Sequence, residues 1–72
     1  MKILYSQHAH KRLRARGISP ADVKKVIRQP DRFNPSPERN RHIVSKTQNG
    51  KILEVIYTIE QSDIIVITAY YI

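Results

Sequence analysis

The chain has 72 residues, which predicts a single small domain spanning residues 1–72 with a thin core. It has no cysteine, so disulfides and thiolate metal sites are excluded, and no apolar run approaches the ~20 residues of a membrane-spanning helix. The net charge is +7 and is uneven: residues 1–41 hold eleven Lys and Arg against three Asp and Glu, whereas residues 42–72 hold two against three. A basic half of this kind predicts an anionic partner such as a nucleic acid, an acidic protein or a membrane surface, the alternative being a merely soluble surface. The lack of cysteine and of a signal-peptide pattern favours the cytoplasm.

Residues 2–5 are predicted to form a short strand, and a helix over residues 7–16 follows it. Ser6 can cap this helix by accepting a hydrogen bond from a free backbone N–H at its start. Gly17 stands where helices often end in a left-handed residue. The sequence therefore gives both ends of the first helix.

A second helix begins directly afterwards and ends before Pro30. Ser19 is its expected N-cap, and Pro20 fits its first position. Two helices joined by a tight turn also match a DNA-binding helix-turn-helix. In that motif the second helix would present three cations to DNA: Lys24, Lys25 and Arg28. No third helix supports the pair, so we expect the helices to cover a sheet instead.

Residues 30–40 contain three prolines and are predicted to be a mobile loop. Three segments after it are rich in β-branched and aromatic residues: 41–48, 51–60 and 63–72. Asn49-Gly50 is a strong hairpin signal between the first two. The order (β)ααβββ predicts an α+β domain in which two N-terminal helices pack on one face of an antiparallel sheet.

The Asn-Gly turn fixes the register of the first hairpin. The opposed pairs are Gln48 with Lys51, Val44 with Val55, and His42 with Tyr57. One face of the sheet is then apolar and is expected to form the core. The other face is mixed and holds Arg41, Ile43, Ser45, Glu54, Ile56 and Thr58. The second hairpin, around residues 60–63, is ambiguous by one residue, and its register decides whether Thr68 and Tyr70 point to the core or to the mixed face.

The last strand is nearly all apolar. Such a strand lies inside a sheet or offers its edge to another chain. A homodimer or a complex with a partner protein through this C-terminal strand is therefore one expectation, and a monomer is the other.

The most prominent candidate site is a ladder on the first helix. His8, Arg12 and Arg16 are spaced i, i+4, i+8 and so share one side of that helix. Two arginines can hold a phosphate, and a histidine titrates near neutral pH. A solvated helix face is the alternative. Arg41, with its neighbours Arg39 and His42, can extend the phosphate-binding surface or can simply form a charged start of the first long strand. A metal site is not expected, because the side chains of His8 and His10 point roughly 200° apart on a helix.

The stretches "SQHAHKRLRARGIS", "RQPDRF" and "IVITAYY" resemble small domains of unknown function that open with Ser-x-His-Ala-x-x-Arg-x-x-x-Arg-Gly-Ile-Ser. Those domains look related to the BrnT and RelE/ParE toxins. The resemblance implies two N-terminal helices on an antiparallel sheet, and a metal-independent endoribonuclease that is paired with an antitoxin and needs no cofactor. It covers nearly the whole chain.

Carried onto matching positions, the resemblance implies that His8 acts as base or acid and that Arg12 and Arg16 hold the phosphate. Thr68 or Tyr70 can contribute if the last strand aims it outward. We therefore predict catalytic roles for His8, Arg12 and Tyr70, and nucleic-acid binding by Arg12, Arg16, Lys24 and Arg41. The expected partners are RNA and an acidic antitoxin protein. The alternative function is a non-catalytic module that binds nucleic acid or an acidic protein.

Overall fold

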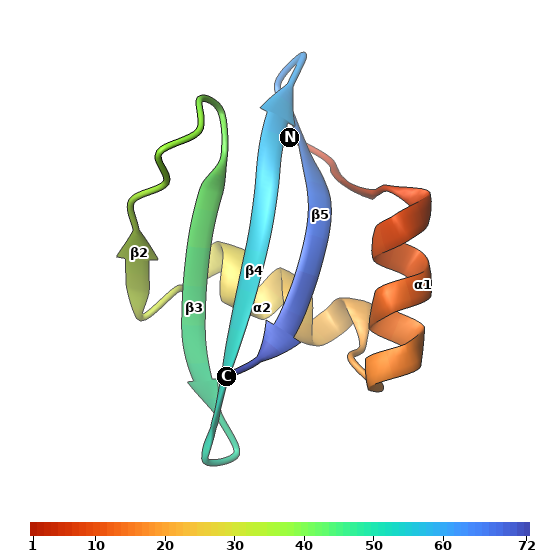
Figure 1. Cartoon of the computed structure of the whole chain (residues 1–72), viewed down its shortest axis with the longest axis vertical. Helices are drawn as coiled ribbons and strands as arrows, with labels where there is room; N and C mark the ends of the chain where they lie inside the picture. The colour runs from red at the N-terminus through yellow and green to blue at the C-terminus, as the bar shows by residue number, and fades with distance from the viewer.

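A computed structural model describes all residues from 1 to 72 and contains two helices and five strands (Figure 1). In chain order these are β1 (Ile3–Tyr5), α1 (Gln7–Arg16), α2 (Pro20–Arg28), β2 (Arg32–Asn34), β3 (His42–Gln48), β4 (Lys51–Glu60) and β5 (Asp63–Tyr71). The α+β class and the order of two helices before three long strands are confirmed. Neither helix has the length and apolar character needed to span a membrane.

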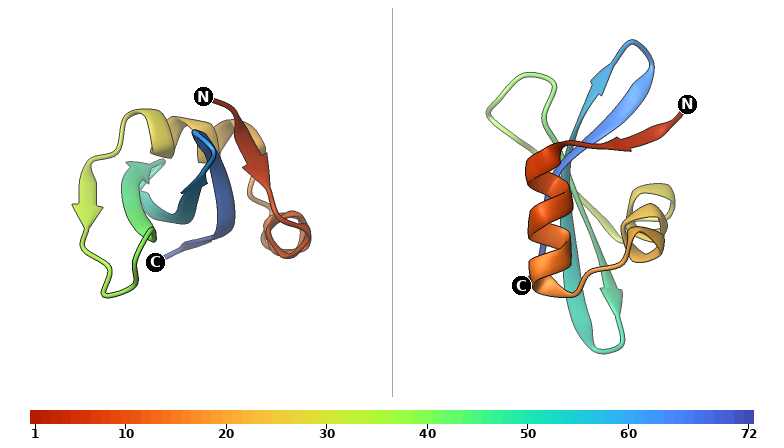
Figure 2. Two further views of the ribbon diagram at one scale, coloured as in Figure 1. Left: turned by 90° about the horizontal axis from the view of Figure 1, so that it is seen from above. Right: turned by 90° about the vertical axis from the view of Figure 1, so that its right-hand side faces the viewer.

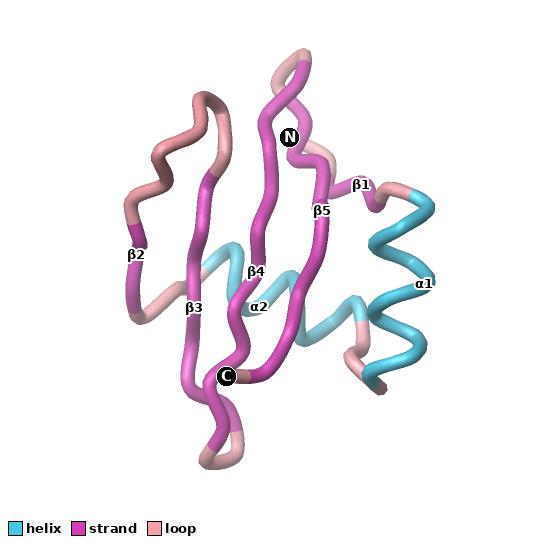
Figure 3. Tube along the Cα trace, in the orientation of Figure 1, coloured by secondary structure: helices cyan, strands magenta, loops and turns pink.

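The strands form one sheet in the order β1-β5-β4-β3-β2. The three long strands are antiparallel neighbours at its centre, as the tube in Figure 3 shows. β1 is parallel to β5, so the sheet is mixed and not purely antiparallel. A parallel pair needs a long connection, and here α1, α2 and the strands β2 to β4 supply it.

The caps of both helices form as predicted. The Ser6 hydroxyl accepts from the backbone N–H of Ala9 at 3.0 Å, and the Ser19 hydroxyl accepts from that of Asp22 at 3.2 Å. Gly17 adopts the left-handed conformation, with φ of 65°, and its N–H donates to the Arg14 carbonyl at 3.2 Å. The helix lengths therefore follow from local chemistry.

Gly17→Ala is expected to lower the free energy of unfolding by about 1 kcal/mol, because a Cβ strains left-handed backbone. No atom lies within 4 Å of the position of that Cβ, so the cost is purely conformational. Urea denaturation measures it. Gly17→Asn is the control and should cost less, since asparagine tolerates this conformation better. Equal costs for both variants would contradict this explanation.

The two helices occupy different places around the sheet (Figure 2). α2 crosses one face and packs on β3 and β4, whereas α1 lies along the β5 side of the sheet. The core lies between the helices and the sheet and holds twelve buried residues: Ala9, Leu13, Ile18, Val23, Val26, Val44, Leu53, Val55, Tyr57, Ile64, Val66 and Ala69. No helix covers the opposite face of the sheet, which we call the open face.

The first hairpin has the predicted register. Gln48 pairs with Lys51, Val44 with Val55, and His42 with Tyr57. Both turn residues have positive φ, as this tight turn requires. The core face is therefore the one that the sequence indicated.

The second hairpin contains a β-bulge in β5. Tyr57 pairs with Val66, but its neighbour Ile56 pairs with Thr68, so β5 carries one extra residue at this point. In a regular ladder without the bulge, Ile67 would pair with Ile56, and Thr68 would face Val55 in the core. With it, Thr68 and also Tyr70 face away from the core. This settles the register that the sequence left ambiguous.

β2 was not expected, because the proline-rich segment 30–40 was predicted to be a loop. The backbone N–H of Asp31 donates to the Ser45 carbonyl at 2.8 Å, and the Asp31 carboxylate accepts from the Thr47 N–H at 2.8 Å. These two bonds hold the next three residues beside β3. A second anchor follows at Asn40, whose side chain forms two hydrogen bonds with the backbone of Ile59.

The edge of β5 is shielded within one chain. β1 pairs with residues 64–66, and α1 lies along the remainder of the strand. Along that remainder the Ala69 carbonyl accepts a hydrogen bond from Arg16 at 2.9 Å. A homodimer through the C-terminal strand stays a prediction.

Candidate functional site

A row of polar side chains crosses the open face. Arg32, Ser45, Glu54 and Tyr70 are directly opposed in the four adjacent strands β2, β3, β4 and β5. Opposed residues in a sheet point to the same face, so the four side chains share this one. The bulge in β5 is what brings Tyr70 into the row.

Glu54 lies at the centre of this row and receives two hydrogen bonds. The Tyr70 hydroxyl donates to Glu54 Oε2, and Asn34 Nδ2 donates to Glu54 Oε1 at 3.1 Å. Each carboxylate oxygen therefore has a donor, and the two donors come from strands on either side of the carboxylate. The carboxylate is fixed in position without a cation in contact with it.

The pairing changes the acidity of Tyr70. The pKa of its phenol lies above the ordinary value, mainly because the phenol donates to Glu54, and further because of partial burial. The positive charge of Arg16 acts in the opposite direction. Tyr70 therefore keeps its proton at neutral pH and directs it at Glu54, which leaves the oxygen lone pairs of Tyr70 free to accept a hydrogen bond.

Arg16 reaches the open face from the last turn of α1. Its Nη1 donates to Thr68 Oγ1 at 3.2 Å and to the Ala69 carbonyl at 2.9 Å. A guanidinium has five N–H donors, and Arg16 makes no other hydrogen bond or ion pair within the chain. It is thus held beside Tyr70 with donors to spare for an anion.

The structure brings together some of the predicted site residues. Arg16 and Tyr70 meet at the open face, as described above. Arg12 and His8 are exposed on the same side of α1, one turn and two turns before Arg16 respectively, and they make no side-chain hydrogen bond or ion pair. Arg41 precedes β3 and forms an exposed ion pair with Glu38 at 3.3 Å.

Lys24 is not part of this group. It lies on α2, and α2 packs on the face of the sheet opposite to the open face. There it lines a shallow groove of about 350 Å³ with Ala21, Lys25, Arg28 and Gln29. None of the three cations in this groove has an acidic partner. The basic half of the chain therefore presents two separate positive surfaces.

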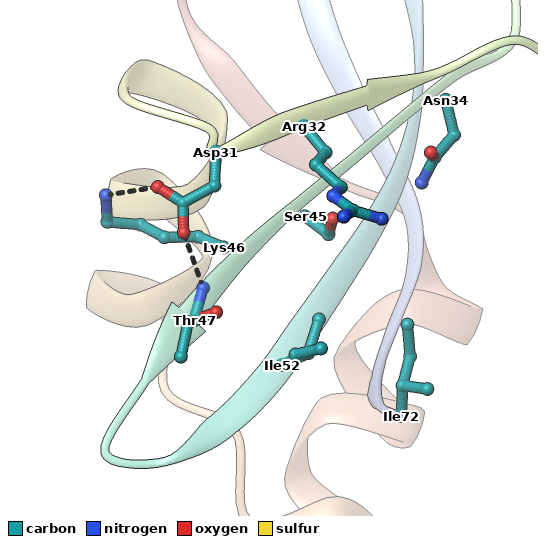
Figure 4. Close-up of a pocket in the computed structure, with 8 residues that line it drawn as sticks. All are labelled: Asp31, Arg32, Asn34, Ser45, Lys46, Thr47, Ile52 and Ile72. Atoms are coloured by element: carbon teal, nitrogen blue, oxygen red, sulfur yellow. Dashed lines mark hydrogen bonds and ion pairs between the residues drawn. The ribbon is translucent and has the colours of Figure 1, made fainter.

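A pocket of about 240 Å³ adjoins the row at its β2 end (Figure 4). Its lining residues are Asp31, Arg32, Asn34, Ser45, Lys46, Thr47, Ile52 and Ile72. The Lys46 ammonium lies 3.5 Å from the Asp31 carboxylate and also donates to the Gln29 carbonyl at 2.9 Å. Asn34 belongs both to this pocket and to the Glu54 cluster, so the two are continuous.

Asp31 has a pKa below its ordinary value, first because the Thr47 N–H donates to it, with Lys46 adding to this and burial opposing it. A carboxyl whose folded pKa is lowered stabilises the fold above its unfolded pKa and loses that contribution as pH falls through the folded value. We expect the Thr47 amide resonance to titrate in NMR spectra at a lower pH than an ordinary aspartate, because it follows the lowered pKa of Asp31. Asp31→Asn should abolish this titration, whereas the control Asp22→Asn should not. A titration that survives Asp31→Asn would contradict the assignment.

Sequence reasoning missed Glu54 and Asn34 as site residues. Glu54 was placed on the mixed face, but no partner for it was identified. Asn34 lay in the segment predicted to be a loop. The signal that pointed to Glu54 is its register opposite Ser45, which follows from the Asn-Gly turn. No cluster of three or more His, Cys, Asp or Glu side chains that could hold a metal ion is present.

One family model matches residues 5–71, which is nearly the whole chain, and its description is a domain of unknown function. No curated protein and no solved structure is significantly similar to the chain.

Proposed function

The chain belongs to the family DUF4258, whose function is unknown, and we propose that it is a metal-independent endoribonuclease of the toxin type that acts with its open face. The hydrogen bond from Tyr70 to Glu54 carries this proposal. It places a proton acceptor behind a phenol at the centre of a sheet face, with Arg16 beside it. The uneven positive charge supports an RNA substrate.

The chemistry needs a base for the 2′-hydroxyl of RNA, positive charge for the pentavalent phosphate and an acid for the leaving oxygen. In the proposed reaction the 2′ oxygen attacks the adjacent phosphorus, and its proton passes to the Tyr70 oxygen. The Tyr70 proton passes at the same time to Glu54. Arg16 and Arg12 stabilise the negative charge that develops on the phosphate.

The bond between phosphorus and the 5′ oxygen then breaks, and His8 supplies the proton that this leaving oxygen takes. The products are a 2′,3′-cyclic phosphate and a free 5′-hydroxyl. Exchange with water returns a proton to His8 and removes one from Glu54. The cycle uses no metal and no cofactor.

The test is cleavage of unstructured RNA by the purified protein in the presence of EDTA. We expect cleavage of RNA, and none of the same sequence with 2′-deoxyribose, because the attacking hydroxyl is then missing. His8→Ala and Arg12→Ala should each slow cleavage. Cleavage of the deoxy substrate would refute the proposed attack, and no cleavage of any RNA would refute the nuclease function.

A second candidate function is binding without catalysis, and the groove on α2 favours it. Lys24, Lys25 and Arg28 form a second positive surface that lies away from the Tyr70–Glu54 pair, as an acidic partner protein would require. An antitoxin of this character would fit the proposed toxin as well. Binding to single-stranded RNA should weaken with salt with a slope of about −0.7 per phosphate contacted. A flat salt profile would exclude phosphate binding.

A further inference from the structure

The pocket between β2 and the central strands has a mixed lining that differs from the rest of the open face (Figure 4). The side chain of Ile52 forms an apolar wall, and it is 41% exposed. Arg32 lies across from it and points over the sheet toward Ser45. A flat ligand with an apolar surface and polar edges matches this combination.

Arg32 is positioned by the backbone rather than by an ion pair. The two hydrogen bonds of Asp31 to β3 fix the start of β2, and Arg32 then pairs directly with Ser45. The Arg32 guanidinium forms no ion pair and no hydrogen bond in the chain. Its N–H groups are therefore available to a ligand in the pocket.

The pocket does not have the character of a phosphate site. Lys46 is the only other cation in its lining, and its charge is already neutralised by Asp31. A phosphate in this pocket would meet only one unpaired cation, Arg32, and the apolar side chain of Ile52 beside it. This is a poor match for a strongly charged anion. A nucleobase fits better, because its face can lie on Ile52 while its edge reaches the guanidinium.

We propose that this pocket binds a guanine base of single-stranded RNA. The guanidinium of Arg32 offers a fork of donors, and guanine presents two neighbouring acceptors, O6 and N7, that match such a fork. Adenine has an amino group where guanine has O6. Its amino donor would therefore face an N–H donor of Arg32, and the two cannot form a hydrogen bond. The assignment rests on the proposed function, because Asn34 joins the pocket to the Glu54 cluster and a base held there would set a neighbouring phosphate near Tyr70.

The test separates base recognition from cleavage. Two 2′-deoxy oligonucleotides, which cannot be cleaved by 2′ attack, carry one guanine or one adenine in a thymine background. We expect the wild-type protein to bind the guanine oligonucleotide about tenfold more tightly, measured by fluorescence anisotropy at constant salt. Equal affinities, or a preference for adenine, would overturn the assignment.

Three variants identify the residue responsible. Arg32→Gln should abolish the preference, and Arg32→Lys should abolish it as well while it keeps the charge, because an ammonium lacks the fork. Arg39→Gln removes the same charge from the exposed neighbouring loop and should retain the preference. Circular dichroism confirms that each variant is folded. A preference that persists in Arg32→Lys would refute the role of the fork.

The outcome is independent of the nuclease test. A guanine preference in a protein that cleaves no RNA would refute the proposed reaction and leave the pocket standing. Cleavage of RNA without any preference in binding would do the reverse.

Discussion

Tyr70→Phe is expected to slow RNA cleavage by at least about 100-fold while RNA affinity and thermal stability change little. The substitution removes only the hydroxyl that donates to Glu54. The phenyl ring stays in the row on the open face, but no oxygen remains to take the proton of the 2′-hydroxyl. Single-turnover rates with saturating protein measure the effect, because they exclude changes in binding.

Glu54→Gln should reduce the same rate to a similar degree, since an amide can accept the hydrogen bond of Tyr70 but not its proton. Tyr71→Phe is the matched control. Tyr71 follows Tyr70 in β5, points to the opposite face and pairs with Leu53, so the same chemical change there should leave cleavage unaffected. A wild-type rate in Tyr70→Phe would show that the pair is structural.

Insertion of one alanine between Ile67 and Thr68 is expected to destabilise the domain by at least about 3 kcal/mol and to abolish RNA cleavage. The insertion keeps the one-residue bulge, places the new alanine opposite Ile56 and shifts the rest of β5 by one position. Thr68 would then face Val55 and Tyr70 would face Leu53, so two hydroxyls would enter the core. Tyr70 would also lose Glu54. Chemical denaturation and the cleavage assay measure the two effects.

Ile67→Ala is the control for the insertion, because it keeps the length of β5 and therefore the register of Thr68 and Tyr70. It removes a half-buried side chain, so a smaller loss of stability is expected, with cleavage retained. An insertion variant with wild-type stability and activity would contradict the importance of this register.

The parts of the fold that depend on neighbouring residues were predictable. Ser6 and Gly17 limit α1 through hydrogen bonds within a few residues, and the Asn-Gly turn sets its hairpin through the backbone conformation of two residues. Such signals are contained in short stretches of sequence. The helices, the three long strands and the first register followed from them.

The parts that depend on distant residues were not predictable. β2 forms because Asp31 makes hydrogen bonds with the backbone of residues 45 and 47. The local propensities of a proline-rich segment do not indicate such bonds. The bulge in β5 likewise depends on how β5 pairs with β4 and packs on both faces of the sheet. Because that bulge decides the direction of Tyr70, the sequence alone could nominate this residue but could not pair it with Glu54.

The bond from Arg16 to the Ala69 carbonyl has a consequence for misfolding. β5 is a run of apolar and β-branched residues of the kind that stacks into amyloid, and its second half has no strand on one side. There, α1 and the Arg16 guanidinium cover the edge, with one peptide carbonyl occupied by the guanidinium. Weaker packing of α1 would expose this strand edge, which could then pair with a strand of another molecule. The basic helix α1 thus also protects the domain from aggregation, and variants of Arg16 should be tested for fibril formation as well as for RNA binding.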